Sequence, residues 1–291
     1  MTLEIAGSQL WQAKLLDGEL VGSRETKVVM RNTSSSVPVK DPTVSGRDYY
    51  ESLYQKQVDA EAEWLRRGAI EKANSIERLL NNHGIHPTTL MELGCGTGAV
   101  IRECQTRGLA QRYIAADYST DALQYLQDST TNIETICTDI TIPGTLPRQV
   151  DVVIVSHVLE HLEAPAVFLQ ALRHIEFSYL IAEVPLEDLY AGRLKSWIWD
   201  RTRNISGHVQ FFNAPSFRRL LAGNGLSVIA ERTYVPILDR DTIKFVSEKN
   251  SANRLQRMRM TITNYYLPSL LESLWAKFYY AHHAVLCNKS A

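Results

Sequence analysis

The 291-residue sequence lacks the features that define several large classes of protein. Its four cysteines, Cys95, Cys104, Cys137 and Cys287, form no CxxC pair and do not have the spacing of a metal-ligand set. No apolar run approaches the ~18 residues needed to cross a bilayer, so we expect no membrane partner. The N-terminal stretch MTLEIAGSQLWQAK lacks the basic and apolar regions of a signal peptide, which favours a reducing, cytoplasmic location.

An excess of charge of one sign is also missing. Thirty-one basic and 32 acidic side chains leave a formal charge of −1. Such a chain has no overall field that would draw it onto nucleic acid or anionic lipid, so we expect no nucleic-acid partner unless a local basic patch provides one. Its length and its 45% hydrophobic content permit one large domain with appendages, or two small domains.

Composition divides the chain into three parts. Residues 1–46 contain short β segments and a Ser/Pro/Gly linker, which predict an N-terminal β appendage whose exposed edge would suit pairing across a homodimer. Residues 47–87 show helical spacing of apolar side chains and predict two helices that form a lid. Residues 88–291 form the predicted core, with a helical insertion at about 238–278.

Short apolar runs alternate with amphipathic stretches in the core. The runs TTLMELG, RYIAADY, IETICTD, VDVVIVS, SYLIAEV, SVIAERTYV and YYAHHAVLCNK predict seven strands. Because helix-length spacers separate most of them, we expect an α/β fold with a mostly parallel sheet and helices on both faces.

A glycine-rich segment, LMELGCGTGAV, ends the first core strand and begins a helix, where an open α/β sheet binds nucleotide-like ligands. Gly94, Gly96 and Gly98 let a ligand approach backbone N–H groups. Asp117 follows Gly98 by 19 residues, at the position of a ribose-binding carboxylate, and Asp139 ends the next strand, where it would accept a hydrogen bond from adenine. Capping of the following helix is the alternative role for either aspartate. The GxGxG spacing argues against a dinucleotide site.

These motifs resemble those of the class I S-adenosylmethionine-dependent methyltransferases. ELGCGTG, AADYS, CTDI and VDVVIVSHVLEHL match the family's first four motifs, and the resemblance covers about residues 88–236 in order, with 281–289 as the final strand. It implies a Rossmann-like methyltransferase fold and S-adenosylmethionine as the cofactor. The residues it assigns to the cofactor are Glu92, Gly94, Gly96, Gly98, Asp117, Tyr118, Asp139, Ile140, Ser156 and, from the helical lid, Tyr54.

The segment SHVLEHL places His157, Glu160 and His161 after the fourth strand. If a helix begins by His157, these side chains are at i, i+3 and i+4 and share one face. His208 lies in a later segment that would return over the pocket. We therefore predict His157, Glu160, His161 and His208 as ligands of zinc, iron, cobalt or nickel, and the three histidines also as catalytic residues.

Two metal-dependent families share part of this pattern. The ubiquinone-biosynthesis O-methyltransferases and the small-RNA 2′-O-methyltransferases carry an acidic-x-x-Glu-His cluster and a later histidine, which bind a divalent metal. Glu160, His161 and His208 resemble the matching positions, whereas His157 replaces a glutamate. That departure favours a softer metal than magnesium, or abolishes the site. Metal-free active-site roles and structural packing are the alternatives for these histidines.

The predicted function is S-adenosylmethionine-dependent methyl transfer to an oxygen or nitrogen of a small molecule, such as a secondary metabolite or saccharide. The segment EVPLED differs from the Asn/Asp-Pro-Pro-aromatic motif typical of enzymes that modify DNA bases and protein glutamine. Two alternatives remain open. One is an RNA 2′-O-methyltransferase, which would bind RNA with a steep salt dependence; the other is a non-catalytic cofactor-binding partner subunit.

Overall fold

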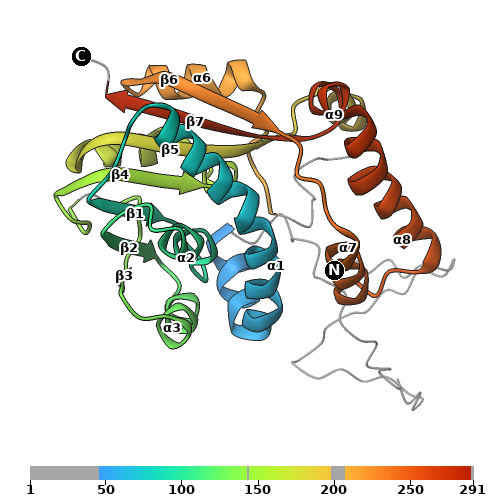
Figure 1. The fold of residues 1–291 in the computed structure, drawn as a ribbon, viewed down its shortest axis with the longest axis horizontal. Coiled ribbons are helices and arrows are strands. Elements are labelled where there is room, and N and C mark those ends of the chain that lie inside the picture. The colour runs from blue at the N-terminus through green and yellow to red at the C-terminus, as the bar shows by residue number, and fades with distance from the viewer. Residues whose placement is uncertain (1–45, 143, 198–206, 290–291) are drawn as a thin grey trace, which may run out of the picture. The chain divides into compact units, whose positions relative to one another are not determined.

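A seven-stranded sheet forms the centre of the computed structural model, which describes residues 46–142, 144–197 and 207–289 (Figure 1). The strand order is β3-β2-β1-β4-β5-β7-β6, and only β7 runs antiparallel to its neighbours. The predicted α/β fold with a mostly parallel sheet is therefore confirmed. The strands are β1 (Thr89–Leu93), β2 (Arg112–Asp117), β3 (Ile133–Cys137), β4 (Gln149–Ser156), β5 (Glu176–Leu186), β6 (Leu226–Tyr234) and β7 (Ala281–Lys289).

Helices precede, connect and follow these strands. They are α1 (Gly46–Asn82), α2 (Ala99–Thr106), α3 (Thr120–Ser129), α4 (Pro165–Ala171), α5 (Tyr190–Ser196), α6 (Ala214–Gly223), α7 (Arg240–Lys249), α8 (Arg254–Thr261) and α9 (Leu267–Phe278). Single turns occur at η1 (Leu159–His161), η2 (Leu172–His174) and the π turn η3 (Ile262–Tyr266). No helix in the described ranges has the length and apolarity to cross a membrane. The predicted β appendage lies outside the described residues.

Alternate side chains of the central strand β4 enter two separate cores. Val153 and Val155 pack in one core with Phe168 of α4, whereas Val152 and Ile154 pack in the other with side chains of α1, α2 and α3. This alternation follows from the two-residue period of a strand. Both faces of the sheet are thus covered by helices, as the helix-length spacers between the strands predicted.

Helix α1 is divided by a kink. Gln57 leaves helical geometry (φ −148°, ψ 37°), so two helical segments meet there, in the stretch where the sequence predicted two helices. The longer segment buries Ala69, Ala73, Ile76 and Leu80 against the sheet at i, i+4, i+7 and i+11. The shorter segment carries Tyr50 and Tyr54 toward the ends of the strands.

The stretch between β6 and β7 contains α7, α8, η3 and α9, where a helical insertion was expected. An ion pair between Lys249 Nζ and Glu61 Oε2, 2.6 Å apart, connects α7 to α1. The two side chains are only 15% and 10% exposed, so this contact is largely sheltered from water. It links the insertion to the helix that covers the glycine loop.

The carboxyl ends of β1, β2, β4 and β5 lie at one edge of the sheet, because these strands are parallel and in register. Ligands of open α/β sheets bind at this edge. The glycine loop follows β1, Asp117 ends β2, and SHVLEHL begins at the end of β4. The fold therefore gathers the predicted site residues into one region.

Candidate active site

The glycine loop after β1 has no room for side chains. Gly94, Gly96 and Gly98 have φ values of 70°, 53° and 74°, the left-handed region that favours glycine. A Cβ atom added at Gly96 would lie 2.5 Å from the hydroxyl oxygen of Tyr54. Tyr54 is buried, so α1 covers the loop with this hydroxyl. The structure thus brings together the predicted glycines and the predicted lid tyrosine.

The buried carboxylate of Asp117, at the end of β2, is hydrogen-bonded to the glycine loop. Its Oδ2 accepts a hydrogen bond from the Gly96 N–H at 2.7 Å, and its Oδ1 accepts one from the Ser119 N–H at 2.9 Å. Ser119 caps α3, so Asp117 is not the cap of that helix. The Oδ1 of Asp139 accepts bonds from the Thr141 N–H (2.9 Å) and hydroxyl (2.6 Å), which hold it in a local turn.

The side chain of Glu92, on β1, is hydrogen-bonded to α2, the helix that follows the loop. Its Oε2 accepts a hydrogen bond from the Ile101 N–H at 2.9 Å. Burial raises the pKa of Glu92 to about 8, although the hydrogen bond and the nearby Lys72 oppose this shift. The carboxyl group is therefore largely protonated at neutral pH.

The other predicted cofactor residues lie along the same strand ends. Tyr118 directly follows β2, and Ile140 is buried in the core that contains Val153 and Val155. Ser156 ends β4, and its hydroxyl is buried with no hydrogen-bond partner among the described residues. A buried hydroxyl without a partner is costly, and this one marks a place where a ligand atom would compensate.

Three of the predicted metal ligands come together beside this region. One ligand atom each from Glu160, His161 and His208 lies within 4.8 Å of the others. The rings of His161 and His208 are 4.9 Å apart. Glu160 is fully buried, and apart from His157 Nδ1, 3.1 Å from Oε1, its carboxylate oxygens have no hydrogen-bond partner within the described part of the chain.

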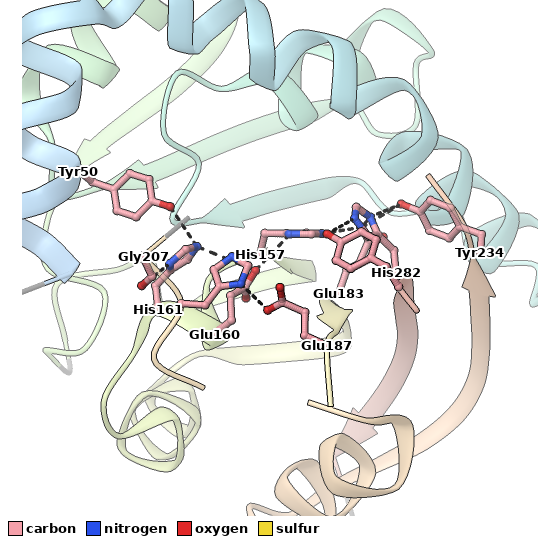
Figure 2. A network of polar contacts seen from close by, with 11 residues as sticks. Tyr50, His157, Glu160, His161, Glu183, Glu187, Gly207, Tyr234 and His282 are labelled. Atoms are coloured by element: carbon pink, nitrogen blue, oxygen red, sulfur yellow. Dashed lines mark hydrogen bonds and ion pairs between the residues drawn. The ribbon is translucent and has the colours of Figure 1, made fainter. Parts of the chain in front are cut away.

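Hydrogen bonds fix the orientation of both imidazoles. The Nδ1–H of His161 donates to the carbonyl oxygen of Gly207 at 3.3 Å, and the Nδ1–H of His208 donates to Glu187 Oε2 at 2.5 Å. Because a carbonyl and a carboxylate only accept, the lone pair of each ring is placed on Nε2. The Tyr50 hydroxyl of α1 lies 3.2 Å from His161 Nε2, as Figure 2 shows.

The charges of this cluster also suit cation binding. Burial lowers the pKa of His161 to about 4, so its imidazole is neutral at neutral pH. Burial alone would raise the pKa of Glu160, but the field and hydrogen-bonding influence of His157 bring it down to about 2. Glu160 is therefore an ionised carboxylate with little hydration, next to the neutral imidazole of His161.

His157 does not occupy the expected position on a helix. Its φ of 57° places it in a left-handed turn, and only the single 3₁₀ turn η1 follows. Its Nδ1 lies 3.1 Å from Glu160 Oε1, and its Nε2 lies 3.2 Å from Glu183 Oε1. The structure therefore divides the predicted four-residue set: His157 groups with Glu183 and His282, and the other three residues form their own cluster.

Sequence reasoning missed Glu183, Glu187 and His282. Glu183 and His282 are buried on the neighbouring strands β5 and β7, and Glu187 directly follows β5. An acid within the apolar run YLIAEVPL and two histidines within AHHAVL are the features that would have found the buried pair. Such residues are costly inside a sheet unless they have partners.

Comparison with known proteins identifies the fold's family. A sequence profile described as a methyltransferase domain matches residues 51–231, more than half of the chain. The chain belongs to this methyltransferase family. Membership makes it an S-adenosylmethionine-dependent methyltransferase, as the glycine loop and Asp117 predicted.

Solved structures share the fold of this methyltransferase at low sequence identity. The matching chain in the structure of a complex between the Haloferax volcanii Trm112 methyltransferase activator and a methyltransferase is 15% identical to this chain. The TM-score is 0.55, and the alignment covers 83% of this chain and 98% of the other. Haemonchus contortus phosphoethanolamine N-methyltransferase 2 is 11% identical, with a TM-score of 0.54 over 87% and 62%. No curated protein sequence matches the chain.

Proposed function

We propose that this methyltransferase modifies an oxygen of a small molecule, such as a secondary metabolite or saccharide, with the help of a divalent metal bound by Glu160, His161 and His208. The observation that carries the proposal is the Glu160 carboxylate, which is fully buried and, apart from His157 Nδ1 at 3.1 Å from Oε1, has no hydrogen-bond partner among the described residues. An ionised carboxylate in that state needs a cation.

The cofactor would bind along the carboxyl ends of β1, β2 and β4. Gly94, Gly96 and Gly98 form a loop whose turns have no room for side chains, so its backbone can face a ligand, and the hydroxyl of Ser156 supports the same location. S-adenosylmethionine supplies an electrophilic methyl group, so the protein has to position an acceptor in line and exclude water. Burial of Tyr54 over Gly96 supports the second task.

The donor set fits a divalent metal of intermediate softness. Two imidazoles and one carboxylate suit zinc, iron, cobalt or nickel better than magnesium, which prefers oxygen ligands. Each imidazole donates its Nδ1–H to an outer acceptor, Gly207 or Glu187, the arrangement typical of ligating histidines. A bound metal would lower the pKa of a coordinated hydroxyl group and so favour its methylation.

Residues around the cluster shield it from water and orient its ligands. Tyr50 approaches His161 Nε2 from α1 and shields that side of the cluster from water. Glu187 holds the ring of His208. An acceptor with two adjacent oxygens suits such a site, because both oxygens can approach one cation.

Metal content tests the proposal directly. The protein would be purified without a histidine tag and analysed by elemental mass spectrometry beside His161→Ala and, as a matched control, the exposed His174→Ala. We expect zinc, iron, cobalt or nickel in the wild type and the control, and about one metal ion per chain less in His161→Ala.

Activity then tests the acceptor. Methyl transfer from labelled S-adenosylmethionine would be measured on catechol-like and vicinal-diol acceptors, with and without a chelator. We expect the chelator to abolish transfer and the metal to restore it. Transfer that is insensitive to the chelator, or a preference for isolated amines, would contradict metal-assisted O-methylation.

A further inference from the structure

A second cluster of ligand-type side chains lies beside the first. His157 follows β4, Glu183 lies on β5 and His282 lies on β7, with one ligand atom of each within 4.8 Å of the others. Figure 2 shows the three side chains converging from these separate elements. All three are largely sheltered, with side-chain exposures of 17%, 4% and 11%.

The spacing of these atoms already matches that of ligands around one ion. Glu183 Oε1 lies 3.2 Å from His157 Nε2 and 3.2 Å from His282 Nδ1. Metal–ligand bonds of about 2.0–2.2 Å at a tetrahedral angle separate neighbouring ligand atoms by roughly 3.3–3.6 Å. A cation would therefore fit between the three side chains with only small shifts.

Each imidazole also has a partner for its other nitrogen. His157 Nδ1 faces Glu160 Oε1 at 3.1 Å, and His282 Nε2 faces the Tyr280 hydroxyl at 3.2 Å. With protons on those nitrogens, the lone pairs of both rings are directed at Glu183. An outer acceptor that fixes the tautomer is characteristic of metal-binding histidines.

The carboxylate has an outer partner as well. The Tyr234 hydroxyl donates to Glu183 Oε1 at 2.9 Å, and burial raises the pKa of this tyrosine, so it remains a donor. Backbone geometry adds a separate observation: His157 adopts φ 57°, an uncommon conformation for a residue with a side chain. Unusual backbone angles of this kind occur frequently at functional sites.

The carboxylates around the two histidine clusters favour the binding of a second cation. Glu160, Glu183 and Glu187 face this region, and the positive group acting on Glu160 and Glu183 from α1 is Lys72.

We propose that His157, Glu183 and His282 form a second divalent-metal site, adjacent to the one assigned to Glu160, His161 and His208. The two sets have the same composition, two histidines and one glutamate, and a ligand of the first, Glu160, is the outer partner of a ligand of the second. The second site rests on its own residues and does not require the first to be occupied.

Zinc stoichiometry tests this inference. Metal-free, untagged protein would be loaded with Zn²⁺, freed of excess ion, and analysed for zinc per chain by elemental mass spectrometry. We expect about two zinc ions in the wild type and about one in each of His282→Asn and His161→Ala. His283→Ala is the matched control, since His283 is also a buried histidine of β7 but belongs to neither cluster, and it should retain both ions.

The outcomes separate the two sites. One zinc that is lost in His161→Ala and kept in His282→Asn would overturn the second site, and one zinc with the opposite dependence would support it and overturn the first. No zinc in the wild type would overturn both. Circular dichroism checks folding, and if His282→Asn does not fold, Glu183→Gln replaces it, with the same expected loss of one ion.

Discussion

The Nδ1 atom of His208 lies 2.5 Å from the Oε2 atom of Glu187. Glu187 directly follows strand β5 and His208 precedes helix α6, 21 residues later, so tertiary structure joins them. The contact sets the tautomer of His208 and aims its Nε2 toward His161 and Glu160. Glu187 is therefore a positioning residue for the proposed metal site.

Replacing Glu187 by glutamine should weaken zinc binding about 10–100-fold, because the ring of His208 would lose its charged partner. Competition with a chelating dye measures the affinity. Glu176→Gln, an exposed carboxyl at the other end of β5, is the control and should bind zinc like the wild type. Equal affinities in both variants would show that Glu187 does not orient the ligand.

Gly96→Ala should weaken cofactor binding. The new Cβ would approach the Tyr54 hydroxyl to 2.5 Å, and φ 53° is unfavourable for alanine. We expect an affinity for S-adenosylhomocysteine at least about 10-fold weaker, measured by calorimetry, a loss of about 1.4 kcal/mol or more. The double variant with Tyr54→Phe removes the clashing oxygen and should recover part of the affinity. Unchanged binding in Gly96→Ala would place the cofactor elsewhere.

Glu92 should make the protein less stable in alkaline solution. Its pKa in the folded chain is raised to about 8 by burial, against a reference value of 4.5, so folding favours its protonated form. This contribution to stability is complete below about pH 4.5 and is lost as pH rises through about 8.

Chemical denaturation at pH 6 to 9 checks this expectation. Glu92→Gln cannot ionise, and it retains an oxygen that accepts from Ile101, so its stability should fall less over this range than that of the wild type. Glu134→Gln changes an exposed carboxyl of β3 and should follow the wild-type curve. Parallel curves for all three proteins would mean that Glu92 does not titrate in this window.

Lys249→Met should destabilise the protein by about 1–3 kcal/mol, because Glu61 would keep a sheltered charge without its partner. Glu61→Gln combined with Lys249→Met removes both charges and should lose less stability than the single lysine variant. Urea denaturation provides the free energies of unfolding for this comparison. A double variant that is less stable than Lys249→Met would argue against an isolated ion pair.

Local sequence patterns predicted much of the fold. Apolar runs with helix-length spacers located all seven strands, and glycine spacing located the loop that Asp117 binds. The pattern failed at His157, where a left-handed turn replaces the first turn of a helix. No local rule could predict that conformation, because β4, β5 and β7 together determine the position of the ring.

The partners of the histidines depend on long-range contacts, which local sequence patterns do not reveal. Glu183 and His282 are 99 residues apart in sequence and become neighbours only because β7 pairs with β5 in antiparallel register. Strand order is a tertiary property, so the pairing of a particular glutamate with a particular histidine does not follow from spacing. The Glu160–His161 part of the cluster was accessible to sequence reasoning because its two residues are adjacent.

Tyr50 and Tyr54 lie on the same short segment of α1, before the kink at Gln57. One hydroxyl covers Gly96 and the other approaches His161. A swing of this segment that uncovers Gly96 therefore also withdraws the hydroxyl from His161. Cofactor exchange and opening of the histidine cluster would then share one hinge, so the kinetic order of cofactor and acceptor binding would be set by a single movement.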